Sequence, residues 1–68
     1  MDETLKGKGI TLIKMANDPD PIESGAKGTI RGVDGIGQIH VDWDNGRSLA
    51  LVPGVDLYQI DSLTYYNV

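Results

Sequence analysis

Three carboxylates lie close together in one stretch of the chain, at Asp18, Asp20 and Glu23. Carboxylate oxygens are the ligands that hard cations such as Ca²⁺ and Mg²⁺ prefer. The stretch reads Asp-Pro-Asp-Pro, however, and it lacks the glycine turn and the trailing bidentate glutamate of an EF-hand loop. We therefore predict no metal site. Asp18 and Asp20 are kept as candidate binding residues on a rigid, solvated loop whose turns depend on Pro and Asp.

His40 is the only histidine of the chain. It shares a predicted strand face with Asp42, and Ser48 follows across a predicted hairpin, so the residue types of a Ser-His-Asp triad occur together. Such a triad also needs a cleft and an oxyanion hole, which a domain of 68 residues rarely supplies. We predict no catalytic residue and no enzyme activity. His40 is instead a candidate surface residue with some cross-strand pairing.

Two arginines, Arg31 and Arg47, fall on different predicted strands. If they converge on one face, their guanidinium groups could hold a phosphate in a bidentate manner. The competing interpretation, which we favour, is simple charge pairing with Asp34, Asp42 and Asp44. Both arginines remain candidate binding residues.

The aromatic residues offer a third kind of site. Trp43, the only tryptophan, alternates with Ile39 and Val41, which predicts a core anchor; the functional alternative is a binding aromatic at a domain rim. Tyr65 and Tyr66 lie in an apolar C-terminal tail, and tyrosine-rich surfaces commonly make contacts. The tail either packs over its own domain or pairs with another copy, and the sequence leaves both open.

The composition excludes several classes of protein. The chain has no cysteine, so it forms no disulfide and no thiolate metal site, and one histidine cannot form a His-cluster zinc site. The net charge of −4 argues against nucleic-acid binding, because phosphate neutralisation dominates that affinity. No apolar run approaches the roughly 20 residues of a membrane span, and the acidic start is unlike a secretory signal. We predict a small cytoplasmic domain without a cofactor.

The elements that must position these side chains are short. Nine glycines divide the chain into pieces of strand length and leave no window for a helix. Apolar and alternating runs predict five strands, at residues 10–15, 28–33, 38–43, 47–52 and 57–60. Asn45-Gly46 predicts a type I′ hairpin turn, and residues 34–37 predict a second hairpin connection that is a little longer and very flexible. Residues 16–26 form the one long loop.

This order of elements is typical of an all-β, SH3-like five-stranded barrel, in which tight glycine hairpins and one long loop join the strands. The barrel is expected at residues 9–60, after a lead-in at 1–8 and before the tyrosine-rich tail at 61–68. Closure removes the exposed sheet edges that so small a chain can hardly protect otherwise. The structural alternative is an open sheet that completes itself by dimerising.

Five short motifs occur in a distinctive order along the chain. They are Asp18-Pro19 with Pro21, residues 25–30 (GAKGTI), residues 33–37 (VDGIG), residues 39–46 (IHVDWDNG) with Ser48-Leu49, and residues 53–56 (PGVD). Together they resemble the domain of unknown function 4314 family, small proteins of bacteria, phages and mobile elements. The resemblance implies a compact SH3-like β domain and supplies no catalytic residues. Longer members often begin with a helical lead-in, which is expected to be missing or reduced here.

Two functions follow as expectations. The first is a non-enzymatic binding module that recognises a protein partner or its own copies, because the strands and turns leave little room for a catalytic site. The alternative is a small-ligand or nucleotide-binding protein of a phage or mobile element, which would use Arg31, Arg47 and an aromatic side chain.

Overall fold

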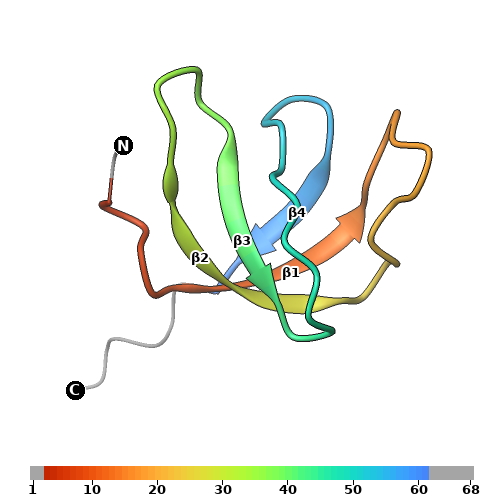
Figure 1. The fold of residues 1–68 in the computed structure, drawn as a ribbon, viewed down its shortest axis with the longest axis horizontal. Coiled ribbons are helices and arrows are strands. Elements are labelled where there is room, and N and C mark those ends of the chain that lie inside the picture. Colours follow the sequence, from red (N-terminus) through yellow and green to blue (C-terminus); the bar gives the residue numbers. More distant parts are fainter. Residues whose placement is uncertain (1–2, 62–68) are drawn as a thin grey trace.

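The computed structural model describes residues 3–61 as one antiparallel sheet without a helix (Figure 1). Its four strands are β1 (Gly9–Lys14), β2 (Lys27–Val33), β3 (Ile39–Trp43) and β4 (Leu57–Ile60). The strand order is β3-β2-β1-β4, and every neighbouring pair is antiparallel. Four of the five predicted strands are therefore confirmed, each within a residue or two of its expected ends.

The predicted alternation of inward and outward residues accounts for the core. Along β2 and β3, every second residue from Gly28 and from Ile39 is buried, while most of the residues between them face outward. The buried apolar side chains are Ile10, Leu12, Met15, Ile22, Ile30, Ile39, Val41, Trp43 and Leu51. Gly28 is buried on this inner face, and a Cβ there would lie only 2.7 Å from the Asp42 carbonyl oxygen. The strand can approach its neighbour so closely only with glycine at this position.

The predicted fifth strand at residues 47–52 does not form, which corrects the expected five-stranded barrel. The β-pairing of this stretch with β3 is limited to two isolated bridges, Asp42 with Ser48 and Ile39 with Leu51. Both bridges have the same register, which would place Leu49 opposite Val41. The Leu49 carbonyl instead accepts a hydrogen bond from the Trp43 indole Nε1–H at 2.9 Å. The ladder is interrupted there because the tryptophan side chain takes the acceptor that a strand would need.

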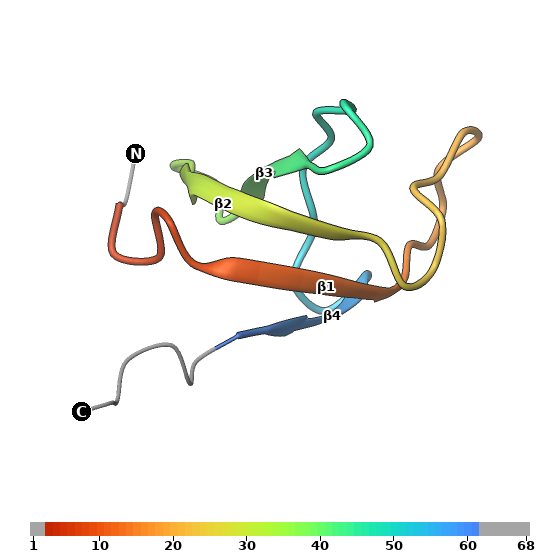
Figure 2. The ribbon, with the colours of Figure 1, turned by 90° about the horizontal axis from the view of Figure 1, so that it is seen from below.

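The segment between β3 and β4 crosses from one edge of the sheet to the other (Figure 2). It places Leu51 against the core, where this side chain has no exposed surface. The sheet is strongly curved in Figure 1, but its edge strands β3 and β4 are not paired with each other. The fold is thus a small all-β domain with an unclosed sheet.

The turn that follows β3 lies where the sequence predicted it but has a different type. Trp43 N donates to Arg47 O, so three residues form the connection, and Gly46 N donates to Trp43 O. Gly46 has φ +90°, whereas Asn45 is not among the residues with positive φ. These features indicate a type I turn followed by a left-handed glycine, rather than the predicted type I′ turn.

Register shifts interrupt the sheet at two points. On β2, Ile30 pairs with Val41 and Gly32 with His40, so Arg31 is an extra residue. On β1, Ile13 is similarly left over between Leu12 and Lys14, opposite β4. Bulges of this kind change the direction of a side chain and bend the strand. They present Arg31 and Ile13 on the outer face of the domain.

Candidate functional site

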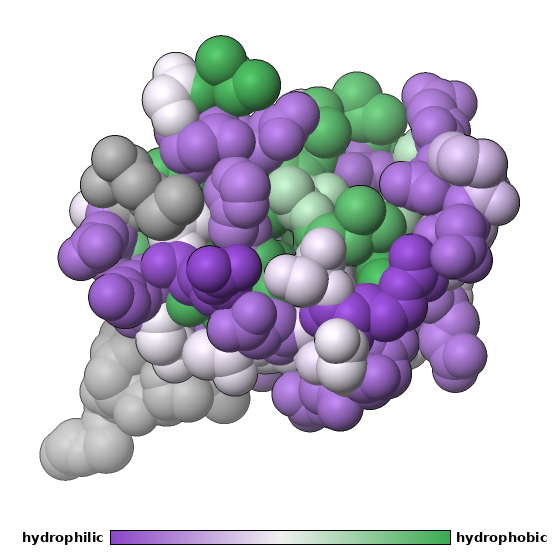
Figure 3. Space-filling view, viewed as in Figure 1, coloured by the Kyte–Doolittle hydropathy of each residue, from purple (hydrophilic) through white to green (hydrophobic). Residues whose placement is uncertain are grey.

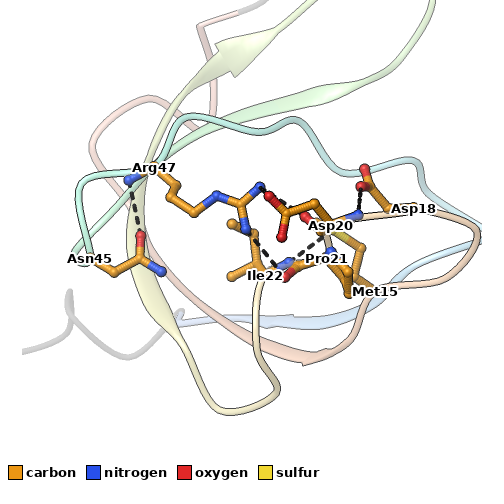
Figure 4. A network of polar contacts seen from close by, with 7 residues as sticks. All are labelled: Met15, Asp18, Asp20, Pro21, Ile22, Asn45 and Arg47. Carbon is orange, nitrogen blue, oxygen red and sulfur yellow. Dashed lines mark hydrogen bonds and ion pairs between the residues drawn. The ribbon is translucent and has the colours of Figure 1, made fainter.

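Arg47 holds the long loop against the domain (Figure 4). Its guanidinium donates to the Asp20 carbonyl at 2.8 Å and to the Pro21 carbonyl at 3.2 Å, and lies 3.4 Å from the Asp20 carboxylate. Arg47 therefore pairs with Asp20 rather than with Asp34, Asp42 or Asp44, the partners that the sequence suggested. The next residue, Ile22, is 2% exposed, and its N–H lies 3.4 Å from the Met15 sulfur.

One carboxylate of this loop, that of Asp18, stabilises a turn. Asp18 accepts a hydrogen bond from the Asp20 N–H at 2.8 Å, as the rigid-loop interpretation predicted for its Asp residues. Within the described part of the chain, no group of three or more His, Cys, Asp or Glu side chains is placed to hold a metal ion.

The start of the long loop is fixed by a residue that sequence reasoning missed. Asp56 is 6% exposed, and its two carboxylate oxygens accept the Ala16 N–H at 2.8 Å and the Val52 N–H at 2.9 Å. It therefore joins two segments that lie 40 residues apart in the chain. The only sequence signal was its place at the end of a Pro-Gly turn, which gives no hint of the distant partner.

Trp43 lies in the core, where it is 3% exposed, as the core-anchor interpretation predicted. Its indole nitrogen is used within the domain by the bond to Leu49. This side chain therefore offers no surface to a ligand in the described structure. The other aromatic candidates, Tyr65 and Tyr66, lie outside the described residues.

Arg31 and His40 come together at a groove on the opposite side of the sheet from the core. The groove has a volume of about 480 Å³ and is open to solvent. Side chains of β2 and β3 form one wall and the turn of the lead-in forms the other. Its lining consists of Glu3, Lys6, Gly7, Thr29, Ile30, Arg31, His40 and Asp42. Arg31 Nε lies 3.7 Å from Asp42 Oδ1, which confirms one of the predicted ion pairs.

His40 is bonded to Asp34 on the other arm of the β2–β3 hairpin, in agreement with the cross-strand pairing that the sequence predicted. Its Nε2 lies 2.8 Å from Asp34 Oδ2, and because a carboxylate only accepts, Nε2 carries the proton. The other oxygen of Asp34 accepts the N–H groups of Ile36 and Gln38. The hydrogen bond from His40, followed by those from these backbone groups, holds the pKa of Asp34 below its ordinary value of 3.8.

The turn that Asp34 organises presents an exposed apolar side chain. Ile36 is 81% exposed, the highest value among the large apolar residues of the described chain. Gly37 N donates to Asp34 O, and Asp34 N donates to Gln38 O, so the turn is closed on both sides. Sequence reasoning treated residues 34–37 only as a flexible connection. The sequence did contain an indication of this exposure, because Ile36 lies between two turn glycines and outside the predicted strands that form the core.

The space-filling view shows the polarity of the face of the domain that is seen in Figure 1. Polar residues cover most of it, and apolar residues emerge in separate places rather than in one broad patch (Figure 3). Arg31 and Arg47 have different surroundings, since one lies beside Asp42 in the groove and the other contacts the long loop. The shared phosphate site that the sequence suggested as an alternative would need the guanidinium groups of both arginines in the same place.

These features define the class of the molecule: a small all-β domain with an open antiparallel sheet, a polar outer groove and an exposed hairpin tip. A family model described as a domain of unknown function (DUF4314) matches residues 3–60. The chain therefore belongs to this family, as the order of its motifs indicated. No curated protein and no solved structure matches the chain. Among residues 3–61, no helix is long and apolar enough to cross a membrane.

Proposed function

We propose that this domain is a non-enzymatic interaction module that recognises a protein partner through the tip of the β2–β3 hairpin. The observation that supports the proposal is Ile36, which is 81% exposed on a turn fixed by Asp34. Burying such a side chain in a partner contributes about 1.5–3 kcal/mol. A rigid turn loses little conformational freedom on binding, so most of that contribution is retained.

The glycine beside Ile36 is consistent with a contact surface. Gly35 has no positive φ, and a Cβ built on it would meet no atom within 4 Å. The fold of this chain therefore does not require glycine at position 35. A slim tip lets the backbone of a partner approach Ile36 closely.

A non-enzymatic role is proposed because the candidate triad residues are engaged separately. His40 Nε2 bonds to Asp34, and among residues 3–61 no hydrogen bond joins the Ser48 hydroxyl to His40. A nucleophile within hydrogen-bond reach of its base is the geometric requirement for such catalysis.

We also infer that the sheet is a reduced form of the SH3-like barrel. The segment 47–52 lies beside β3 and the strand order is β3-β2-β1-β4, which is the order that such a barrel would have with its fourth strand shortened. The two bridges and the indole bond to Leu49 support this assignment. Many barrels of this kind serve as docking modules. A cytoplasmic location and a phage or mobile-element origin remain predictions.

The proposal is tested by comparing Ile36→Ser with Ile13→Ser, a matched change at another exposed isoleucine (52% exposed). Each protein is immobilised, exposed to lysate of the source cells and analysed by quantitative mass spectrometry. We expect a partner that the wild type and Ile13→Ser retain and that Ile36→Ser binds at least about tenfold less. Equal retention by all three proteins would refute a role for the tip.

Sedimentation of the purified chain separates a foreign partner from a second copy. Self-association that Ile36→Ser abolishes would identify the partner as another copy of this chain. A strictly monomeric protein with no specific lysate partner would contradict the proposed function as a whole.

A further inference from the structure

The geometry points to a second site: we infer that the groove between the lead-in and β2–β3 binds the oxyanion group, phosphate or carboxylate, of a small ligand. This inference does not depend on the proposed role of the hairpin tip. It rests on how the groove is built and on the state of the two cations that line it, Lys6 and Arg31.

The β2 bulge presents the Arg31 side chain at the groove, and most of its N–H donors remain available to a ligand. Its side chain is 55% exposed, and only Nε approaches a carboxylate, at 3.7 Å from Asp42. That separation is too long for a hydrogen bond. Among residues 3–61, no hydrogen bond joins either terminal nitrogen of Arg31 to another residue. A guanidinium fork in this state matches the two oxygens of a carboxylate or phosphate.

Lys6 supplies a second cation from a turn that is fixed to the sheet. Gly7 N donates to Ile30 O at 2.8 Å, and Ile30 N donates to Lys8 O at 2.9 Å, so the lead-in continues the pairing of β1 with β2. Lys6 Nζ lies 3.8 Å from Glu3, and both side chains are more than half exposed. Such exposed pairs contribute at most about 1 kcal/mol, so a ligand can replace them at little cost.

The lining also limits which ligand fits. A volume of about 480 Å³ lies within the usual range of small-molecule sites. Glu3 and Asp42 stand beside the two cations and would repel a polyanion, but they can accept hydrogen bonds from donor groups. The groove therefore suits a ligand that carries one oxyanion together with donors. A mononucleotide and the carboxyl end of a peptide share this chemistry.

The test is a titration of the full chain followed by amide and side-chain NMR. The probes are inorganic phosphate, adenosine monophosphate, and one short peptide prepared with a free and with an amidated carboxyl end. We expect shift changes at groove residues such as Thr29, Arg31 and His40. Arg31→Gln should weaken binding by about tenfold or more, because hydrogen bonds to charged groups contribute about 1.5–3 kcal/mol.

Lys14→Gln is the matched control, since it removes one exposed cation outside the groove. Equal weakening by Lys14→Gln and Arg31→Gln would show only nonspecific attraction and would overturn the inference. Absence of binding for every probe at millimolar concentration, with all variants folded, would overturn it too. Stronger binding of the mononucleotide than of the free-carboxyl peptide would identify a phosphorylated ligand. Loss of peptide binding on amidation would identify a peptide carboxylate.

Discussion

Two loops of this domain each carry an isoleucine, and the two side chains have opposite environments. Ile22, in the loop between β1 and β2, is 2% exposed, whereas Ile36, in the loop between β2 and β3, is 81% exposed. Both loops contain Asp and Gly, so the presence of these turn residues does not predict which isoleucine is buried. The first loop completes the core and the second extends away from it. The exposed isoleucine of the second loop is the side chain on which the proposed contact surface depends.

The polar contacts of the two loops differ in the same way. Residues distant in sequence fix the long loop by hydrogen bonds. Arg47 donates to the carbonyls of Asp20 and Pro21, and the Asp56 carboxylate accepts the Ala16 N–H. The hairpin is held from within, because Asp34 bonds to its own turn and to His40 six residues later. The long loop thus depends on the tertiary fold, and the hairpin tip keeps its shape by local bonds.

The largest difference is expected when the two isoleucines are truncated. Ile22→Ala should destabilise the domain by about 2–5 kcal/mol, since it leaves a cavity in the core, and Ile36→Ala should change stability by less than about 0.5 kcal/mol. Urea denaturation monitored by Trp43 fluorescence measures both. Because the first change approaches the whole stability of so small a domain, Ile22→Val, with about 0.5–1.5 kcal/mol, provides a graded check. Similar effects at the two positions would remove the contrast between the loops.

A somewhat smaller loss is expected at Asp56. Asp56→Ala removes the acceptor of the Ala16 and Val52 N–H groups, and a buried donor without a partner costs about 1–3 kcal/mol. Asp56→Asn keeps one acceptor oxygen and should recover part of the loss. The control is Asp18→Ala, which removes a hydrogen bond on the exposed part of the same loop. Thermal unfolding should rank the variants in that order, and an equal effect of the control would contradict the assigned role.

The next effect is local rather than global. Arg47→Ala removes two bonds to loop carbonyls and a partly exposed ion pair, for which we expect about 1 kcal/mol. Hydrogen exchange should become faster in residues 16–26 and stay unchanged in β2 and β3. Arg47→Lys keeps the charge but not the fork, and should restore little of the protection. Uniformly faster exchange throughout the sheet would show that Arg47 does not act on the long loop alone.

The smallest effect concerns the hairpin and depends on pH. The pKa of Asp34 is lower in the folded protein than its ordinary value of 3.8, so its stabilising contribution is complete above that value. It is lost as the pH falls through the lowered pKa of the folded state. Asp34→Asn should therefore be less stable than the wild type at pH 6, and the difference should shrink towards zero below pH 3.8. Asp44→Asn, a matched change at an exposed turn residue, is the control for general charge effects, and a deficit of Asp34→Asn that persists below pH 3.8 would contradict the assigned role.

The strands were predictable from the sequence because the period-2 alternation in residues such as Ile39, Val41 and Trp43 directly reports which face is buried. The segment 47–52 shows where this reasoning fails. Its Leu49 and Leu51 alternate like those of a strand, yet the Trp43 indole takes the Leu49 carbonyl. No local sequence pattern predicts this hydrogen bond, because it depends on the direction of the Trp43 side chain of β3.

The candidate sites divide in the same way. Asp42 was one of three carboxylates that the sequence suggested as partners of the arginines, and it pairs with Arg31. The pairing of Arg47 with Asp20 spans 27 residues and depends on the folded loop. His40 was expected on the face of Asp42 with some cross-strand pairing, but the sequence did not identify Asp34 as its partner. The sequence shows an isoleucine at position 36, but only the folded structure shows that its side chain is exposed.

The sequence by itself determined that this protein is a small all-β domain of the DUF4314 family without cysteine chemistry, because composition, periodicity and glycine spacing are local properties of the chain. Only the tertiary structure decided that the sheet stays open, that the long loop completes the core, and that Lys6, Arg31 and His40 line one groove. Those features arise from contacts between residues distant in sequence. Their partners are selected by the packing of the whole domain.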